Sequence, residues 1–303
     1  MDAIVTAGGI PQPEDPLYIY SQGDSKALID IAGKSMIQWI LDALGDAKHV
    51  DNVIIIGLSP KSSITCKKPM YFLSNQGRML SNIVAGIKKS LELDKKNKHV
   101  LIVSSDIPTI KPEMVDWLVE TSMQTQDDLY YGVCPKDVME ARFPNSKRTW
   151  TRLKDMAVCG ADMHISHVSM ASTEHLETWE ALMGNRKSPL RQAGIVGLAT
   201  FLAYLTRSDT LEQMVERISK RINIAGRAIV WPYAEPCMDV DKPHQLELLR
   251  DDLASQERKE ATKARRAKAK SNATNAEKPI SKRSSGVRKP AALAKPKTKL
   301  KQQ

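Results

Sequence analysis

The sequence predicts an α/β protein: a three-layer sandwich with a mostly parallel central sheet, extended by a helical insertion and a disordered basic tail. Three observations support this prediction. Short β-branched runs alternate with helix-like segments, 42% of the 303 residues are hydrophobic, and positive charge is concentrated near the C-terminus. Alternation of strands and helices is typical of parallel sheets that helices cover on both faces.

The first half of the chain contains this alternation. The expected strands lie at residues 3–6, 52–56 and 100–104, and the expected helices at residues 35–47 and 79–91. A further helix is expected after Lys111, because Pro112 suits the first turn of a helix. In such sheets, ligands bind beyond the carboxyl ends of the strands.

The second half of the chain is less regular. The expected strands lie at residues 129–133, 162–168 and 227–231, and a helical insertion at 174–222 contains expected helices at 174–183, 189–205 and 211–222. A last helix is expected to begin at Lys242 and to continue into the charged region. The uncharged stretch 192–206 is interpreted as a buried helix, with contact at a membrane surface left open as the alternative.

The tail carries most of the positive charge. Residues 255–303 contain 16 Lys and Arg against 3 Glu, a charge of +13, whereas the whole chain carries +10. Beyond Ala261 almost no residue could contribute to a core, so the composition predicts disorder. We therefore expect the chain to have two parts, a folded domain at residues 1–254 and a disordered basic tail at residues 255–303.

The composition also bears on localisation. The four cysteines lie far apart and lack the spacing of zinc ligands, which fits a reduced compartment. The N-terminus has no signal-peptide pattern, and no apolar run reaches the ~18 residues of a transmembrane segment. We therefore expect a cytoplasmic protein.

A glycine pair follows the first expected strand. Gly8 and Gly9 place backbone N–H groups at the strand end, where the missing Cβ atoms leave room for a phosphate. An ordinary tight turn is the alternative. Lys26 ends the following loop, where its ammonium group could stabilise a transferring phosphoryl group; a solvated lysine is the alternative there.

Two acidic motifs are candidates for a metal site. Asp106 follows an expected strand in SSDIP, and Asp239 and Asp241 lie two residues apart in DVDKP, on one face of an extended segment. Carboxylates suit Mg²⁺, and a cation relieves the repulsion between two close carboxylates. The alternatives are that Asp106 caps a turn and that Asp241 caps the next helix.

Other polar residues give weaker signals. Gly77 and Arg78 precede a helix whose N-terminus could bind an anion. His164 and His167 lie three residues apart in an expected strand. An odd separation places them on opposite faces, so we expect no shared metal.

In the order of these motifs the chain resembles the nucleotidyltransferases of the type A fold, particularly the NTP transferases similar to molybdenum cofactor guanylyltransferase. The matching segments are VTAGG at 5–9, KALIDIAGKSMIQWILDAL at 26–44, Gly77 before a helix, SSDIP at 104–108 and DVDKP at 239–243. They span about the first 250 residues. The resemblance implies a nucleotide-diphospho-sugar transferase-like fold and transfer of an NMP from an NTP to a small phosphorylated acceptor, with release of pyrophosphate.

The resemblance also implies roles for individual residues. Lys26 and Asp106 are the implied catalytic residues, and Asp106, Asp239 and Asp241 are the implied Mg²⁺ ligands. The implied nucleotide-binding residues are Ala7, Gly8, Gly9, Lys26, Gly77 and Asn82.

One loop departs from the family pattern. Gly9 is followed by IPQPEDPLYIYSQGDS, which lacks the G-x-R of the family. Glu14 and Asp15 occupy the place of a phosphate-binding arginine, and Ser25 replaces the usual proline. Acids beside a triphosphate weaken its binding unless they turn outward. A non-catalytic nucleotide-binding protein is therefore one alternative function, and a polyanion or nucleic-acid binder acting through the basic tail is another.

Overall fold

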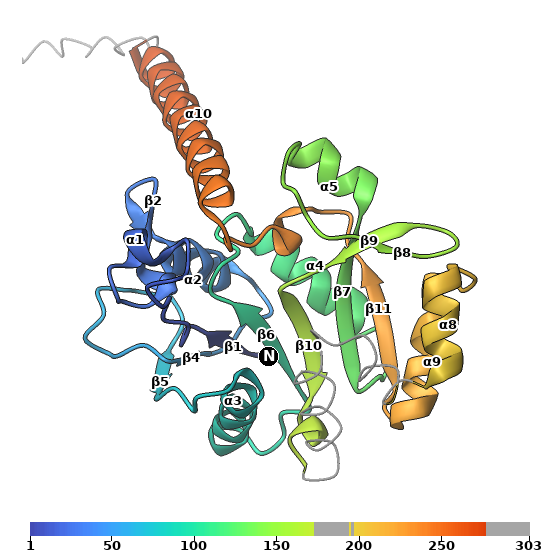
Figure 1. Cartoon of the computed structure of the whole chain (residues 1–303). Helices are drawn as coiled ribbons and strands as arrows, with labels where there is room; N and C mark the ends of the chain where they lie inside the picture. The colour runs from blue at the N-terminus through green and yellow to red at the C-terminus, as the bar shows by residue number, and fades with distance from the viewer. Residues whose placement is uncertain (173–193, 195–196, 277–303) are drawn as a thin grey trace, which may run out of the picture. The chain divides into compact units, whose positions relative to one another are not determined.

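Helices cover both faces of a central sheet in the computed structural model, which describes residues 1–172, 194 and 197–276 (Figure 1). This arrangement confirms the predicted three-layer α/β fold. The chain divides into two compact units, Met1–Gln256 and Glu257–Gln303. The first unit contains the sheet and the candidate site.

The sheet is mixed and mostly parallel. In the described part of the chain its nine strands are β1 (Asp2–Thr6), β4 (Val53–Ile56), β5 (Met70–Leu73), β6 (His99–Ser104), β7 (Leu129–Pro135), β8 (Thr151–Arg152), β9 (Ala157–Gly160), β10 (Met163–His167) and β11 (Gly226–Val230). β1 lies between β4 and β6 and is parallel to both. β10 runs antiparallel between β6 and β7, so its first residues lie beside the last residues of β6.

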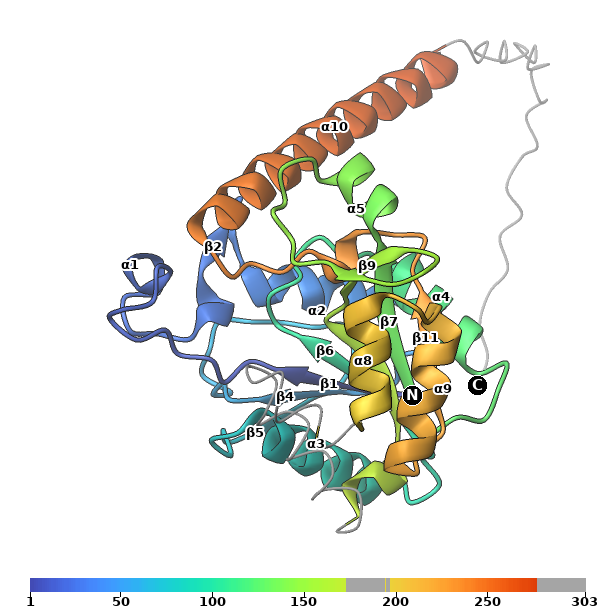
Figure 2. The same ribbon diagram turned by 45° about the vertical axis from the view of Figure 1, so that its right-hand side comes forward.

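The helices form the two outer layers. Their bounds are α1 (Tyr18–Ser21), α2 (Met36–Asp46), α3 (Met79–Leu93), α4 (Pro112–Ser122), α5 (Lys136–Arg142), α8 (Leu198–Thr206), α9 (Leu211–Ile222) and α10 (Pro243–Ala276). The described residues also form the short 3-10 helices η1 (Lys26–Leu28), η2 (Val168–Ala171) and η3 (Glu235–Cys237), and a small hairpin that pairs β2 (Asp30–Ile31) with β3 (Lys34–Ser35). α2 and α4 pack on one face of the sheet, and α3 and α9 on the other (Figure 2).

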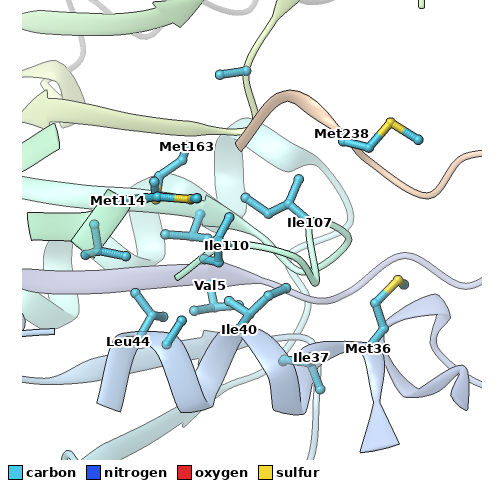
Figure 3. Close-up of a cluster of buried hydrophobic side chains, with 14 of the residues drawn as sticks. Val5, Met36, Ile37, Ile40, Leu44, Ile107, Ile110, Met114, Met163 and Met238 are labelled. Carbon is cyan, nitrogen blue, oxygen red and sulfur yellow. The ribbon is translucent and has the colours of Figure 1, made fainter. Parts of the chain in front are cut away.

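The main core lies between the sheet and α2. Ile37, Ile40 and Leu44 recur at helical spacing and are fully buried, which is the pattern of a helix with one apolar face. Figure 3 shows residues of this cluster from elements far apart in the sequence, including Met163 of β10 and Met238. The burial of Met238 anchors the segment that carries the second acidic motif.

Most predicted elements are present. Every expected strand has a counterpart within two residues, and the expected helix at 211–222 matches α9, which begins with a capping box of Thr210 and Gln213. The expected helix at 174–183 lies outside the described residues, and that at 189–205 is described only from Leu198. The sequence analysis did not predict β5, β8, β9 and α5, which are short.

α8 differs from its prediction as a buried helix. Leu198, Leu202 and Leu205 are exposed, whereas Thr200 and Ala203 are buried. The reason is that α8 packs against α9 rather than inside the sheet layers. Among the described residues, no helix combines the length and apolar character needed to cross a membrane.

The prediction of a disordered basic tail at residues 255–303 stays a prediction. α10 continues to Ala276, and residues 277–303 lie outside the described part of the chain. Residues 257–276 are rich in Ala, Lys and Arg, which are strong helix formers. A helix bonds its backbone internally, so a segment without core residues can still be helical.

Candidate active site

The glycine pair lies where β1 leaves the sheet, against two other loops. The carbonyl of Gly8 accepts a hydrogen bond from Asn75 Nδ2 at 2.9 Å. A Cβ added to Gly57, which has a φ of +100°, would lie 2.3 Å from the Gly8 Cα atom. Around Gly9 a Cβ would meet nothing within 4 Å. Gly8 is thus enclosed on the protein side, whereas Gly9 is exposed.

We expect Gly57→Ala to lower the free energy of unfolding by about 2–4 kcal/mol, because the new methyl group meets backbone and the positive φ disfavours alanine. Urea unfolding measures this change. Gly9→Ala is the matched control, since its methyl group enters open space, and it should change stability by less than about 0.5 kcal/mol. Equal losses in the two variants would contradict the prediction.

Two hydrogen bonds close the loop after the glycine pair and place Lys26. The backbone N–H of Lys26 donates to Gly9 O at 2.9 Å. The Ser25 hydroxyl donates to Ala7 O at 2.8 Å and accepts from Ala27 N. Ser25 therefore caps η1 in place of the proline of the family pattern. The ammonium group of Lys26 is thereby held beside the strand that carries the glycines.

The unusual acids of this loop lie at the surface. Glu14 and Asp15 are both exposed. The carboxylate of Asp15 accepts a hydrogen bond from Leu17 N at 2.8 Å, in the turn just before α1. Asp15 therefore has a local structural role.

Lys26 joins the two acidic motifs. Its Nζ atom lies 2.9 Å from Asp106 Oδ2 and 2.8 Å from Asp241 Oδ1. The backbone N–H of Val240 also donates to Asp106 O at 3.0 Å, which fixes the two motifs side by side. Asp106 and the acids of the second motif, which lie at least 133 residues further along the sequence, thus meet at one strand end.

These contacts set the charge state of Lys26. Burial lowers the pKa of Lys26, but the carboxylates of Asp106 and Asp241 outweigh it and raise the pKa to about 12. Burial raises the pKa of Asp241, and the ammonium group of Lys26 outweighs that effect, so the pKa lies below its ordinary value. Near neutral pH, the site therefore contains a protonated lysine and an ionised Asp241.

The structure adds two residues that the sequence analysis missed, Arg148 and Asp162. Arg148 forms an ion pair with Asp239, and its Nη2 atom donates to Gly160 O at 3.3 Å. Asp162 lies between β9 and β10, and its carbonyl accepts from Ser104 N at 2.9 Å. No local pattern marks Arg148, whereas Asp162 is the first residue of the strand expected at 162–168, which is a weak signal of a strand-end position.

Asp162 differs from the other acids in its charge. Burial raises the pKa of Asp162 to about 7, the carboxylate of Asp106 acts in the same direction, and Arg148 partly opposes both. Below pH 7 this carboxyl group is therefore mostly neutral. Its neutral form limits the repulsion among the acids that meet here.

We expect Asp162→Asn to flatten the pH dependence of stability. The folded state keeps the Asp162 proton up to pH about 7, whereas the unfolded state loses it near the ordinary value of 3.8. The free energy of unfolding therefore falls as the pH rises between these values, by at most about 4 kcal/mol. Urea unfolding at pH 5 and pH 8 without added metal measures this. The same fall in the variant and the wild type would contradict the prediction.

Three carboxylates of the site can hold a metal ion. One oxygen each of Asp106, Asp239 and Asp241 lies within 4.8 Å of the others. Asp106 Oδ1 is buried and has no hydrogen-bond partner among the described residues. A buried acceptor without a partner is unfavourable, and a bound cation would satisfy it. Carboxylate oxygens are the ligands that Mg²⁺ prefers, so these residues fit such an ion.

The second glycine loop packs against the first. Gly77, with a φ of +81°, donates its N–H to Asn75 Oδ1 at 2.9 Å. Asn82 is buried, accepts from Gln76 N at 2.7 Å and donates to Asn75 Oδ1 at 3.1 Å. Asn82 therefore holds the turn beside Gly8, and its direct contact with a nucleotide stays a prediction. Asn75 is the residue of this loop that the sequence analysis missed.

The two histidines lie on opposite faces of the sheet. His164 stacks on Tyr131 with ring centroids 4.4 Å apart, whereas His167 contacts His99 on the other side. Burial lowers the pKa of His164 to about 4, so this ring is neutral. The two side chains cannot share a metal ion.

Comparison with solved structures gives related folds. A hypothetical transferase from Thermus thermophilus is 28% identical to this chain, with a TM-score of 0.70, and the similarity covers 81% of this chain and 98% of that one. CMP:2-keto-3-deoxy-manno-octonic acid synthetase in complex with CTP is 14% identical, with a TM-score of 0.50 over 84% of this chain and 98% of the other. No curated protein matches the chain.

The family model of the MobA-like NTP transferase domain matches residues 20–194. This range is more than half of the chain and contains Lys26, Asp106 and Asp162. The chain therefore belongs to the MobA-like NTP transferase family and is a nucleotidyltransferase.

Proposed function

We propose that this nucleotidyltransferase moves an NMP from an NTP to a small phosphorylated acceptor in the presence of Mg²⁺ and releases pyrophosphate. The observation that carries the proposal is the meeting of Lys26, Asp106 and Asp241, with Lys26 bonded through its backbone to Gly9. A cation and carboxylates beside exposed backbone at a strand end are what binding of a metal–triphosphate requires.

In this proposal, an oxygen of the acceptor phosphate attacks the α-phosphorus, and the bond between that phosphorus and the bridging oxygen to the β-phosphate breaks. Asp106, Asp239 and Asp241 would hold Mg²⁺, which would supply positive charge to the phosphates. Gly8 and Gly9 offer their backbone to the nucleotide. Because its pKa is about 12, Lys26 stays protonated and acts as a fixed charge rather than as a base.

Pyrophosphate release tests the proposal. The protein is incubated with each of the four NTPs, Mg²⁺ and a panel of small phosphorylated acceptors. We expect release with at least one NTP–acceptor pair and none after EDTA treatment. A protein that binds Mg²⁺–NTP but never releases pyrophosphate would be the non-catalytic nucleotide-binding protein instead.

The tail is a second candidate for a ligand-binding segment. Its charge of +13 favours contact with a polyanion through counterion release. We expect the full chain to bind single-stranded RNA or DNA with an affinity that falls steeply as salt rises, and removal of residues 255–303 to abolish that binding. Fluorescence anisotropy at 50 and 200 mM salt measures both effects. Equal binding by the shortened chain would contradict this role.

A further inference from the structure

An apolar groove of about 320 Å³ lies between α9 and the sheet. Its size is at the lower end of small-molecule sites. Leu211 and Met214 of the amphipathic helix α9 pack against the sheet, yet no α9 residue is fully buried, so space remains along the inner face of the helix. The aliphatic lining includes Leu129, Val133, Val158, Met214, Ile218 and Ile222.

The groove borders the candidate active site. Tyr131 and Gly160 line the groove, and a Cβ at Gly160 would lie 2.7 Å from the Tyr131 hydroxyl oxygen. Gly160 O also accepts the hydrogen bond of Arg148, whose guanidinium group pairs with Asp239. Gly160 therefore links the lining of the groove to the acids.

The groove also lies on the side where an acceptor is needed. The strand order β1-β6-β10-β7-β9 places the glycine pair after β1 and Asp106 after β6, whereas the groove lies over β7, β9 and β11. The acids thus stand between the proposed nucleotide site and the groove. Arg148 bonds both to Gly160 in the groove lining and to Asp239 among the acids, and a guanidinium group is of the kind that binds phosphate.

We propose that the groove binds the hydrocarbon part of the acceptor, so that the acceptor is a phosphate monoester of an aliphatic alcohol. This inference rests on the proposed function and names the acceptor class. The acceptor's phosphate lies at Arg148, and its hydrocarbon chain extends under α9. A non-bridging oxygen of this phosphate forms the new bond to the α-phosphorus of the NTP. Pyrophosphate leaves with the electrons of the broken bond between the α-phosphorus and the bridging oxygen, and the ionised acceptor phosphate has no proton to lose.

Calorimetry with a series of alkyl phosphates, from ethyl to decyl below its micelle concentration, tests the inference without NTP or metal. We expect affinity to rise about threefold to fourfold for each added methylene until the groove is full. Ile218→Trp, which fills the groove, and Ile218→Asp, which makes it polar, should both remove this dependence. Leu202→Trp on exposed α8 is the matched control and should keep it. Thermal unfolding verifies that each variant is folded.

Ethyl and decyl phosphate binding with equal affinity would overturn the proposal, as would an unchanged dependence in both Ile218 variants. Decanol binding as tightly as decyl phosphate would also overturn it, because the phosphate would then contribute nothing. These outcomes are independent of pyrophosphate release. A protein that transfers an NMP to short phosphates but shows no chain-length dependence would retain the proposed function and lose this inference.

Discussion

Asp106→Asn is expected to reduce kcat/KM for pyrophosphate release by about a thousandfold. Asp106 places one oxygen 2.9 Å from Lys26 Nζ and leaves the other buried without a partner among the described residues. An amide cannot replace the second carboxylate oxygen as a cation ligand, and it removes the charge that pairs with Lys26. The variant should lose the metal and the alignment of the lysine together.

The measurement is steady-state pyrophosphate release across Mg²⁺ concentrations, with stability followed by urea unfolding. Asp106→Asn is nearly isosteric and relieves repulsion among acids, so we expect its free energy of unfolding to stay within about 1 kcal/mol of the wild type. Asp46→Asn is the matched control, because Asp46 pairs with Lys67 at an exposed position of α2. A folded Asp106→Asn protein with more than a tenth of wild-type activity would exclude Asp106 from catalysis.

Lys26→Met is expected to reduce transfer by about a hundredfold or more and to tighten metal binding in the absence of nucleotide. The first effect follows from loss of a positive charge beside the transferring phosphoryl group. The second follows because the ammonium group of Lys26 occupies oxygens of Asp106 and Asp241, which are proposed metal ligands. Its removal leaves both carboxylates to the cation, and we expect the affinity for Mg²⁺ to rise about tenfold.

Calorimetric titration with Mg²⁺ alone separates these two effects from a general loss of structure. Lys67→Met serves as control, since Lys67 pairs with Asp46 on the surface and its side chain is 73% exposed. We expect it to change neither activity nor metal affinity. If Lys26→Met bound Mg²⁺ more weakly than the wild type, the ion would not share the carboxylates that the lysine contacts.

The regular elements of the fold could be predicted because their signals are local. Strand and helix periodicities occur within single segments, so β1, β4, β6 and α9 appear where the sequence places them. β4 and β5 both have four residues, but β4 is a fully buried β-branched run, whereas β5 is half-buried and has no β-branched residue. α5 has only seven residues, too few to repeat the helical period clearly. The helix expected from Lys242 into the charged region corresponds to α10, which ends at Ala276, because Ala, Lys and Arg favour a helix even where core residues are absent.

The site was predictable in part. Strand ends and short motifs marked Gly8, Lys26 and Asp106, and the structure brings the last two together with Asp241. Asp162 and Arg148 were missed because their position depends on elements that pair across the sheet. Asp162 reaches the site only because β10 enters antiparallel beside β6, a reversal that no residue of the strand itself encodes.

The sequence by itself determined the α/β class, the order of its elements and the chemical types at the strand ends, because each depends on neighbours along the chain. Only the tertiary structure decided which charges face one another and where the described residues leave apolar surface uncovered. Arg148 beside Asp239 and the groove beneath α9 both arise from contacts between distant segments. Such contacts depend on how whole elements pack, which is a property of the assembled fold.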